Sequence, residues 1–283
     1  MSRSGLDKFN ANNFFLSDGQ TALPKLTHGS LFSGIGGFDL AAEWIGWENI
    51  FHCEIDEWAR KLLKQNFPNA TQHADIRQLD GTKYRGTIDV ISGGFPCQPF
   101  SRAGRQQGKE DNRYLWPEML RVINEVKPKF VVGENVAGIV NLALDEVCSS
   151  LEDSGYQIEI FNIPACAVGA DHIRERIWIL AYSGSDSISQ CLLNWNGQQI
   201  EEWDKRKKEW CENRNITQMG TEIDRGVFIG RPFSEPKIVR IYNEESTELY
   251  EIKGLGNAIV TQVAFEIFTV IDFVLREERK KNY

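Results

Sequence analysis

The sequence predicts an α/β fold in which a mostly parallel β-sheet carries helices on both faces and a small second domain interrupts the chain. Short apolar runs, such as residues 88–91 and 130–132, alternate with segments whose apolar residues recur at helical spacing, such as 57–67 and 115–126. A glycine-rich turn follows the first apolar run, at the position where open α/β sheets bind ligands. With 283 residues, the chain can hold one large domain and one small domain.

Each element is predicted from its local pattern. The expected strands are residues 26–32, residues 50–53, a third strand whose end is marked by residues 73–76, residues 88–91, 130–132 and 156–163, and a run that follows Arg176. The expected helices are residues 38–45, 57–67, 115–126, 142–151 and 258–275. Lys127-Pro128 ends the third helix, since proline cannot continue it. The charged run 276–281 is expected to be a solvated tail.

The composition restricts the class of protein. A hydrophobic content of 41% and a charged content of 25% are ordinary for a globular domain. No apolar stretch approaches the roughly 18 residues of a membrane span, and the N-terminus lacks a signal-peptide pattern, so we expect a cytoplasmic protein without membrane contact. The six cysteines lie far apart without a Cys-x-x-Cys pair, which predicts no metal site and no disulfide framework. The net charge of −8 disfavours a nucleic-acid partner but does not exclude a basic cleft.

Cys97 lies on an unusual stretch of backbone. The segment Gly93-Gly94-Phe95-Pro96-Cys97-Gln98-Pro99-Phe100-Ser101 follows an apolar run, and neither a strand nor a helix can continue through it. A lone cysteine is usually a small buried apolar residue. A core position does not need prolines on both sides, so the sequence predicts a thiol presented on a stiff turn at the carboxyl end of a strand.

This nonapeptide resembles the catalytic motif of the cytosine-C5 DNA methyltransferases of bacterial or phage type. Four further blocks resemble the same family, in the family's order, and together they cover roughly residues 27–183 and 252–275. They are Phe32-Ser33-Gly34-Ile35-Gly36-Gly37-Phe38, Glu134-Asn135-Val136, Arg174-Glu175-Arg176 and Gly256-Asn257-Ala258. The resemblance implies a Rossmann-like S-adenosylmethionine-dependent methyltransferase fold, with a mixed seven-stranded sheet whose last strand is antiparallel.

The resemblance also implies how the chain is divided. A polar N-terminal extension, residues 1–25, would precede a catalytic and cofactor-binding domain, residues 26–184. The composition changes after Tyr182, and residues 185–251 lie where the family inserts a small target-recognition domain. Residues 252–283 would then return a helix to the catalytic domain.

The resemblance assigns four catalytic residues. Cys97 would attack carbon 6 of a flipped-out cytosine, and Glu134 would hydrogen-bond the ring and deliver a proton. Arg174 and Arg176 would hold Glu134 and the base, with Arg176 as the cation that lowers the pKa of the thiol. His172 stands where glutamine is most familiar in the family.

The cofactor-binding residues are implied in the same way. The glycine-rich turn would bind S-adenosyl-L-methionine with Phe32 stacked on the adenine, Glu54 would bind the ribose hydroxyls, and Asp75 with Ile76 would contact the adenine. Two alternatives stay open: the turn could be a plain glycine-rich turn, and Asp75 could cap the following turn. The full set is Phe32, Ser33, Gly34, Ile35, Gly36, Gly37, Glu54, Ile55, Asp75, Ile76, Pro96, Leu115 and Asn257.

The expected partners are double-stranded DNA and a cognate restriction endonuclease, with no metal. Two other functions remain open. A tRNA cytosine-C5 methyltransferase would keep the chemistry and change the substrate. A non-catalytic DNA-binding or regulatory relative is suggested by the net acidity, the short recognition segment and His172.

Overall fold

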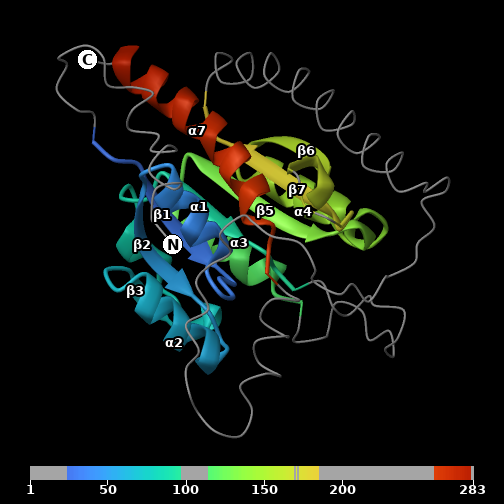
Figure 1. Cartoon of the computed structure of the whole chain (residues 1–283). Coiled ribbons are helices and arrows are strands. Elements are labelled where there is room, and N and C mark those ends of the chain that lie inside the picture. The colour runs from blue at the N-terminus through green and yellow to red at the C-terminus, as the bar shows by residue number, and fades with distance from the viewer. Residues whose placement is uncertain (1–23, 97–113, 169, 171, 185–257, 282–283) are drawn as a thin grey trace, which may run out of the picture.

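The computed structural model describes residues 24–96, 114–168, 170, 172–184 and 258–281, and these build a seven-stranded sheet with helices on both faces (Figure 1). The strand order is β3-β2-β1-β4-β5-β7-β6. The strands are β1 (Thr27–Leu31), β2 (Glu48–Cys53), β3 (Thr71–His73), β4 (Val90–Gly93), β5 (Phe130–Val136), β6 (Gln157–Pro164) and β7 (Glu175–Tyr182).

The pairing is parallel from β3 through β5, and β7 runs antiparallel to both β5 and β6. This confirms the expected mixed seven-stranded sheet with its last strand reversed. The parallel strands therefore end at one edge, where side chains that are distant in the sequence come together.

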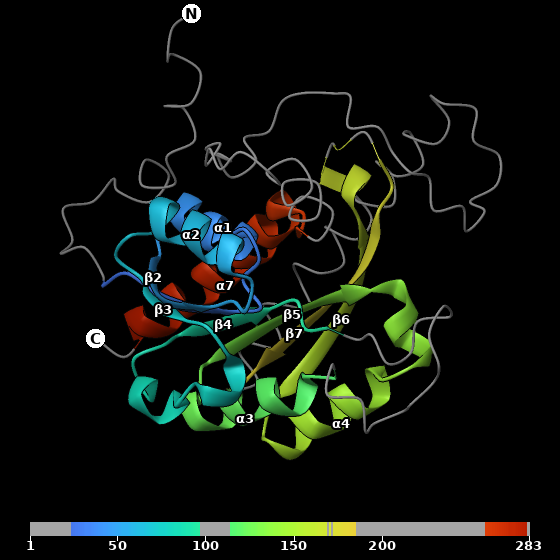
Figure 2. The same ribbon diagram turned by 90° about the horizontal axis from the view of Figure 1, so that it is seen from below.

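The helices form two layers, as Figure 2 shows: α1, α2 and α7 cover one face of the sheet, and α3 and α4 cover the other. Their bounds are α1 (Gly37–Trp44), α2 (Glu57–Asn66), α3 (Trp116–Val126), α4 (Leu144–Asp153) and α7 (Thr261–Lys281). Short 3-10 helices span Ile76–Gln78, Gly81–Tyr84, Ala137–Asn141 and Ala165–Val168.

Neighbouring residues along the central strands point to opposite faces of the sheet, and their side chains pack in two separate hydrophobic cores. Val90 and Val132 pack in the core beneath α1 and α7, whereas Ile91 and Val131 pack in the core beneath α3. This alternation follows from the two-residue period of a strand. It explains why β4 and β5 begin with consecutive apolar residues, 90–91 and 130–132, since both of their faces are buried there.

The last helix extends beyond its expected end. We expected residues 276–281 to be a solvated tail, but α7 continues to Lys281. Two of its charged residues are anchored: Arg276 Nε lies 2.6 Å from Asp272 Oδ2, and Arg279 Nη2 lies 2.8 Å from Asp89 Oδ1. The sequence alone gives the appearance of a solvated tail, because it does not show that Arg276 pairs with an acid on the same helix and Arg279 with an acid that is distant in the sequence.

None of the helices in the described residues is long and apolar enough to cross a membrane. The N-terminal extension and the predicted target-recognition domain lie outside the described residues, so both stay predictions.

Candidate active site

The glycine-rich turn between β1 and α1 has a backbone that requires glycine. Gly34 and Gly36 have positive φ angles of 54° and 91°, and Phe32 shares this left-handed region at 53°. A Cβ on Gly36 would lie 2.5 Å from the ring of Phe67, so that position is also closed sterically. A Cβ on Gly34 would meet nothing within 4 Å, so the turn has an open side where a ligand can approach the backbone.

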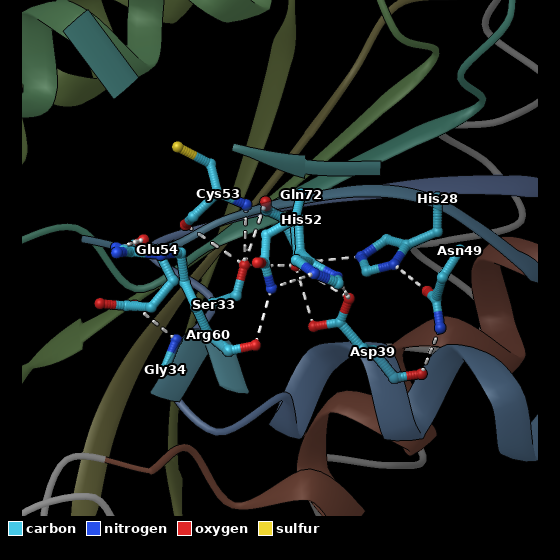
Figure 3. Close-up of polar contacts among 12 residues, drawn as sticks. His28, Ser33, Gly34, Asp39, Asn49, His52, Cys53, Glu54, Arg60 and Gln72 are labelled. Atoms are coloured by element: carbon cyan, nitrogen blue, oxygen red, sulfur yellow. Dashed lines mark hydrogen bonds and ion pairs between the residues drawn. The ribbon is translucent and has the colours of Figure 1, made fainter. Parts of the chain in front are cut away.

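Glu54, at the end of β2, faces this turn. Its Oε2 accepts the Gly34 amide at 2.7 Å, and its Oε1 accepts the Asp56 amide at 2.8 Å (Figure 3). Each carboxylate oxygen can accept a second hydrogen bond, so two ribose hydroxyls could still be bound. Ile55 is 66% exposed, an apolar side chain available for packing on a flat ring. These residues fit a nucleoside-containing cofactor.

Asp75 caps the 3-10 helix that follows β3. It accepts the Arg77 amide at 3.0 Å and pairs with the Arg77 guanidinium at 2.8 Å. These contacts hold the pKa of the Asp75 carboxyl below its usual range. The capping alternative is therefore confirmed, while a contact with adenine stays a prediction. Ile76 is buried, and its carbonyl accepts Arg121 Nη2 at 2.7 Å.

Glu134 lies on β5 as a buried acid with a cationic partner. Its Oε1 is 3.0 Å from Arg176 Nε, and the two side chains are 11% and 19% exposed. Burial raises the pKa of the Glu134 carboxyl, while the charges of Arg176 and Arg174 oppose that shift. A carboxyl poised in this way can hold a proton and give it up when the charge nearby changes.

The two arginines do not lie on one regular strand. Arg176 belongs to β7, opposite Val136, whereas Arg174 precedes β7 with a left-handed φ of 34°. Arg174 Nη2 donates to the carbonyl of Ala258 at 2.7 Å, just before α7. Arg174 therefore joins the Glu134 region to the chain that returns after residue 257, and burial lowers the pKa of its guanidinium.

The turn that leads to Cys97 is fixed beside Glu134. Asn135 Nδ2 donates to the Phe95 carbonyl at 2.9 Å, and the ring of Phe95 packs against Trp116 with centroids 4.9 Å apart. A Cβ on Gly94 would lie 3.2 Å from Glu134 Oε2, so the backbone approaches the carboxylate closely. The described turn ends at Pro96, and both Cys97 and Asn257 lie outside the described residues.

Comparison with known proteins identifies this arrangement. A family model described as C-5 cytosine-specific DNA methylase matches residues 26–225. The chain belongs to the C-5 cytosine-specific DNA methylase family. It is 39% identical over 158 residues to the type II methyltransferase M.Eco47II of Escherichia coli, and 42% identical over 134 residues to M.PspPI of a Psychrobacter species. It is 34% identical over 163 residues to M.HhaI of Haemophilus parahaemolyticus.

These matches cover 53%, 45% and 56% of this methylase-family chain, respectively. They cover only 38%, 32% and 49% of the three relatives, so the chain spans less than half the length of each. Within its described residues, no group of three or more histidine, cysteine or acidic side chains could hold a metal ion.

Sequence reasoning missed two residues that position the site in this family member. Asn135 belongs to the Glu134-Asn135-Val136 motif but was assigned no role, although its Nδ2 donates to the Phe95 carbonyl. Arg60 Nη1 donates to the carbonyls of Glu54 and Ile55 at 2.9 and 2.6 Å and so fixes the end of β2. The sequence gives a weak signal for Arg60, which follows Glu54 by six residues within a helix that otherwise looks structural.

Proposed function

We propose that the chain transfers a methyl group from S-adenosyl-L-methionine to carbon 5 of cytosine in double-stranded DNA. The buried pair of Glu134 and Arg176 supports this most directly, because it lies beside the turn that leads to Cys97. Family membership supports the same reaction class.

The chemistry follows from the weak nucleophilicity of cytosine carbon 5. The Cys97 thiolate would add to carbon 6 while Glu134 gives a proton to the ring nitrogen, which produces an enamine with a nucleophilic carbon 5. S-adenosyl-L-methionine, when bound, supplies an electrophilic methyl group for carbon 5. S-adenosyl-L-homocysteine would be left after the transfer. Solvent water would then accept the carbon 5 proton, Glu134 would take back the proton from the ring nitrogen, and β-elimination would restore the ring and release the Cys97 thiolate.

Arg176 would act on Glu134 in this sequence of steps. Its guanidinium stabilises the ionised carboxylate, so the proton leaves Glu134 more readily than burial alone would allow. It also fixes the carboxylate position, since Nε and Oε1 are in hydrogen-bond contact. Arg174 adds a second positive charge to the same region.

The cofactor would lie along the carboxyl ends of β1 and β2. Glu54 would accept its ribose hydroxyls, Ile55 would pack on its adenine, and the open side of Gly34 would allow close approach. Asn257 would complete the site from the chain that precedes α7.

The target cytosine must leave the base stack, because neither carbon 5 nor carbon 6 can be attacked within a duplex. We assign recognition of the surrounding sequence to residues 185–251. The relatives are type II methyltransferases by name, which supports a pairing with a restriction endonuclease of the same target.

Covalent trapping tests the proposal. The protein is incubated with S-adenosyl-L-methionine and mixed-sequence duplex DNA that contains 5-fluorocytosine, because fluorine at carbon 5 blocks the final elimination. We expect a denaturant-stable adduct with the wild type and none with Cys97→Ala. Absence of an adduct on varied DNA, with cofactor binding shown separately, would refute the DNA reaction, and an adduct on tRNA alone would reassign the substrate.

A further inference from the structure

Buried hydroxyl groups form a hydrogen-bonded chain that links the glycine-rich turn to an acid on α1 (Figure 3). Ser33 Oγ is 2.6 Å from Ser30 Oγ, and Ser30 Oγ lies 2.9 and 3.0 Å from the two carboxylate oxygens of Asp39. Asp39 and Ser30 are fully buried and Ser33 is nearly so. A buried carboxylate is costly, so its presence here calls for a physical reason.

Counting hydrogens gives this chain a direction. When Asp39 is ionised it only accepts, so Ser30 must donate its single hydrogen to it. Ser33 then donates to Ser30, and its own oxygen accepts the Cys53 amide at 3.2 Å. The hydrogen bonds thus run from the end of β2 through Ser33 and Ser30 to Asp39. The hydroxyl hydrogens of both serines are used as donors in this arrangement.

Protonation of Asp39 can reverse that direction. The protonated acid can donate to Ser30, which frees the Ser30 hydrogen for Ser33. Ser33 must then turn its hydrogen to a backbone carbonyl, either Ser30 O at 3.2 Å or Cys53 O at 3.3 Å. These are longer contacts, and none of them is made to a charged group.

The surroundings of Asp39 place this change near neutral pH. Burial raises the pKa of the Asp39 carboxyl to about 7, against the Ser30 hydrogen bond and with a small contribution from Glu43 on the same helix. From β2, the buried His52 has its Nδ1 3.9 Å from Asp39 Oδ1, and burial lowers the pKa of this imidazole to about 4, so it is neutral. Helix α7 packs against α1, and its buried acid Asp272 is paired with Trp47 and Arg276.

Ser33 connects this chain to the candidate cofactor site. The Ser33 amide donates to the Cys53 carbonyl at 3.1 Å, and its hydroxyl accepts the Cys53 amide, so two bonds fasten the turn to the end of β2. The residues that follow Ser33 and Cys53 are Gly34 and Glu54, and both belong to the candidate cofactor site. The Gly34 amide donates to the Glu54 carboxylate. The orientation of the Ser33 hydroxyl therefore affects both the glycine-rich turn and the end of β2, which together form that site.

We propose that Asp39 is a positioning residue for the cofactor, acting through Ser30 and Ser33 to hold the glycine-rich turn against the end of β2. The inference rests on the proposed function, because it takes this turn as the S-adenosyl-L-methionine site. Asp39 itself is fully buried and hydrogen-bonded to Ser30, so it acts through the two serines.

If Asp39 only stabilised the fold, Asp39→Asn would change the stability of the protein and leave cofactor binding unchanged. The native pKa of Asp39 lies above its unfolded value of 3.8, so ionisation costs folding stability as pH rises from about 4 to about 7. Asp39→Asn removes that cost and mimics the protonated acid. We expect this variant to be at least as stable as the wild type at pH 8, yet to bind the cofactor more weakly.

The experiment is calorimetric titration of the full chain with S-adenosyl-L-methionine between pH 5.5 and 8.5. For Asp39→Asn at pH 8 we expect about a fivefold to tenfold higher Kd, from replacing a charge-assisted hydrogen bond by a neutral one. Wild-type affinity should fall toward that of the variant as pH drops through about 7. The Kd of the variant should not change over this step.

The strands supply a matched control. Ser30 on β1 and Ser92 on β4 are register partners, and both are fully buried. Ser92 Oγ is hydrogen-bonded to His28 Nε2 at 2.8 Å, whereas Ser30 Oγ is hydrogen-bonded to Asp39. Ser30→Ala and Ser92→Ala delete the same hydroxyl from the same layer. We expect Ser30→Ala to weaken cofactor binding about fivefold or more, and Ser92→Ala to leave it within about twofold.

The outcomes separate the two levels of inference. A wild type that does not bind S-adenosyl-L-methionine would refute the proposed function. A wild type that binds it, with equal affinity and equal pH dependence in Asp39→Asn and with Ser30→Ala no weaker than Ser92→Ala, would overturn only the role of Asp39.

Discussion

The pair of Arg176 and Glu134 gives a prediction whose size can be worked out. Unit charges at their 3.0 Å separation attract by about 5.5 kcal/mol at an effective dielectric constant of about 20. Arg176→Met keeps much of the side-chain volume and removes the charge. The net loss should be smaller, about 3 kcal/mol of unfolding free energy at pH 8, because the charge of Arg174 remains and Glu134 can take up a proton.

That proton gives the loss a distinctive pH dependence. The pKa of Glu134 is already raised by burial, and removing Arg176 raises it further, so Glu134 keeps its proton up to a higher pH in the native variant than in the wild type. Each unit of pH below the variant's pKa recovers at most about 1.4 kcal/mol. The deficit should therefore be smaller at pH 6 than at pH 8.

Urea unfolding followed by circular dichroism at pH 6 and pH 8 measures this. Lys61→Met is the control, because Lys61 pairs with Glu57 on the exposed face of α2 and its removal should cause no measurable pH-dependent change. An Arg176→Met deficit that is the same at both pH values would show that Glu134 does not take up the proton, and would refute the electrostatic description of the site.

Three further variants test the site piece by piece. Glu134→Gln should lower kcat by about 10²- to 10⁴-fold in a methyl-transfer assay, since the amide cannot deliver the proton; a loss of under threefold would remove Glu134 from the reaction. Asn135→Ala leaves the Phe95 carbonyl without its donor, so it should cost about 1–2 kcal/mol of unfolding free energy and slow 5-fluorocytosine adduct formation without changing cofactor affinity. Ile55→Ala should raise the Kd for S-adenosyl-L-methionine about fivefold and leave unfolding within about 0.5 kcal/mol, while Ile160→Ala, exposed on β6, should change neither.

The order of strands and helices could be predicted because each element carries its own local signal. The apolar runs at 88–91 and 130–132 are short and bounded by breakers, and helix α3 ends where Pro128 requires it. Strand β5 extends to Val136, farther than its apolar run, because Glu134 and Asn135 are polar for the site and still pair with β7. The end of α7 was mispredicted for a similar reason: the partner of Arg279, Asp89, is distant in sequence.

The candidate site could be predicted to the level of residue type and neighbourhood, and no further. The sequence motifs placed Glu134 and Arg176 in one site, and the structure brings them into contact. The chain from Ser33 to Asp39 gave no sequence signal, because a buried acid on a helix looks like a first-turn acid on any helix. Only the structure shows that Asp39 accepts hydrogen bonds from the hydroxyl of Ser30 on β1.

Helix α7 has a consequence for how the protein is made. It follows β7 only after the long stretch between Tyr182 and Thr261, yet its apolar residues, among them Ile267, Phe268 and Ile271, complete the core beneath α1. During synthesis the α3 side of the sheet can consolidate as soon as β7 has left the ribosome, whereas the α1 side keeps a bare apolar surface until the last helix emerges. That surface is a natural target for chaperones, and a chain shortened before α7 should be retained by them or aggregate.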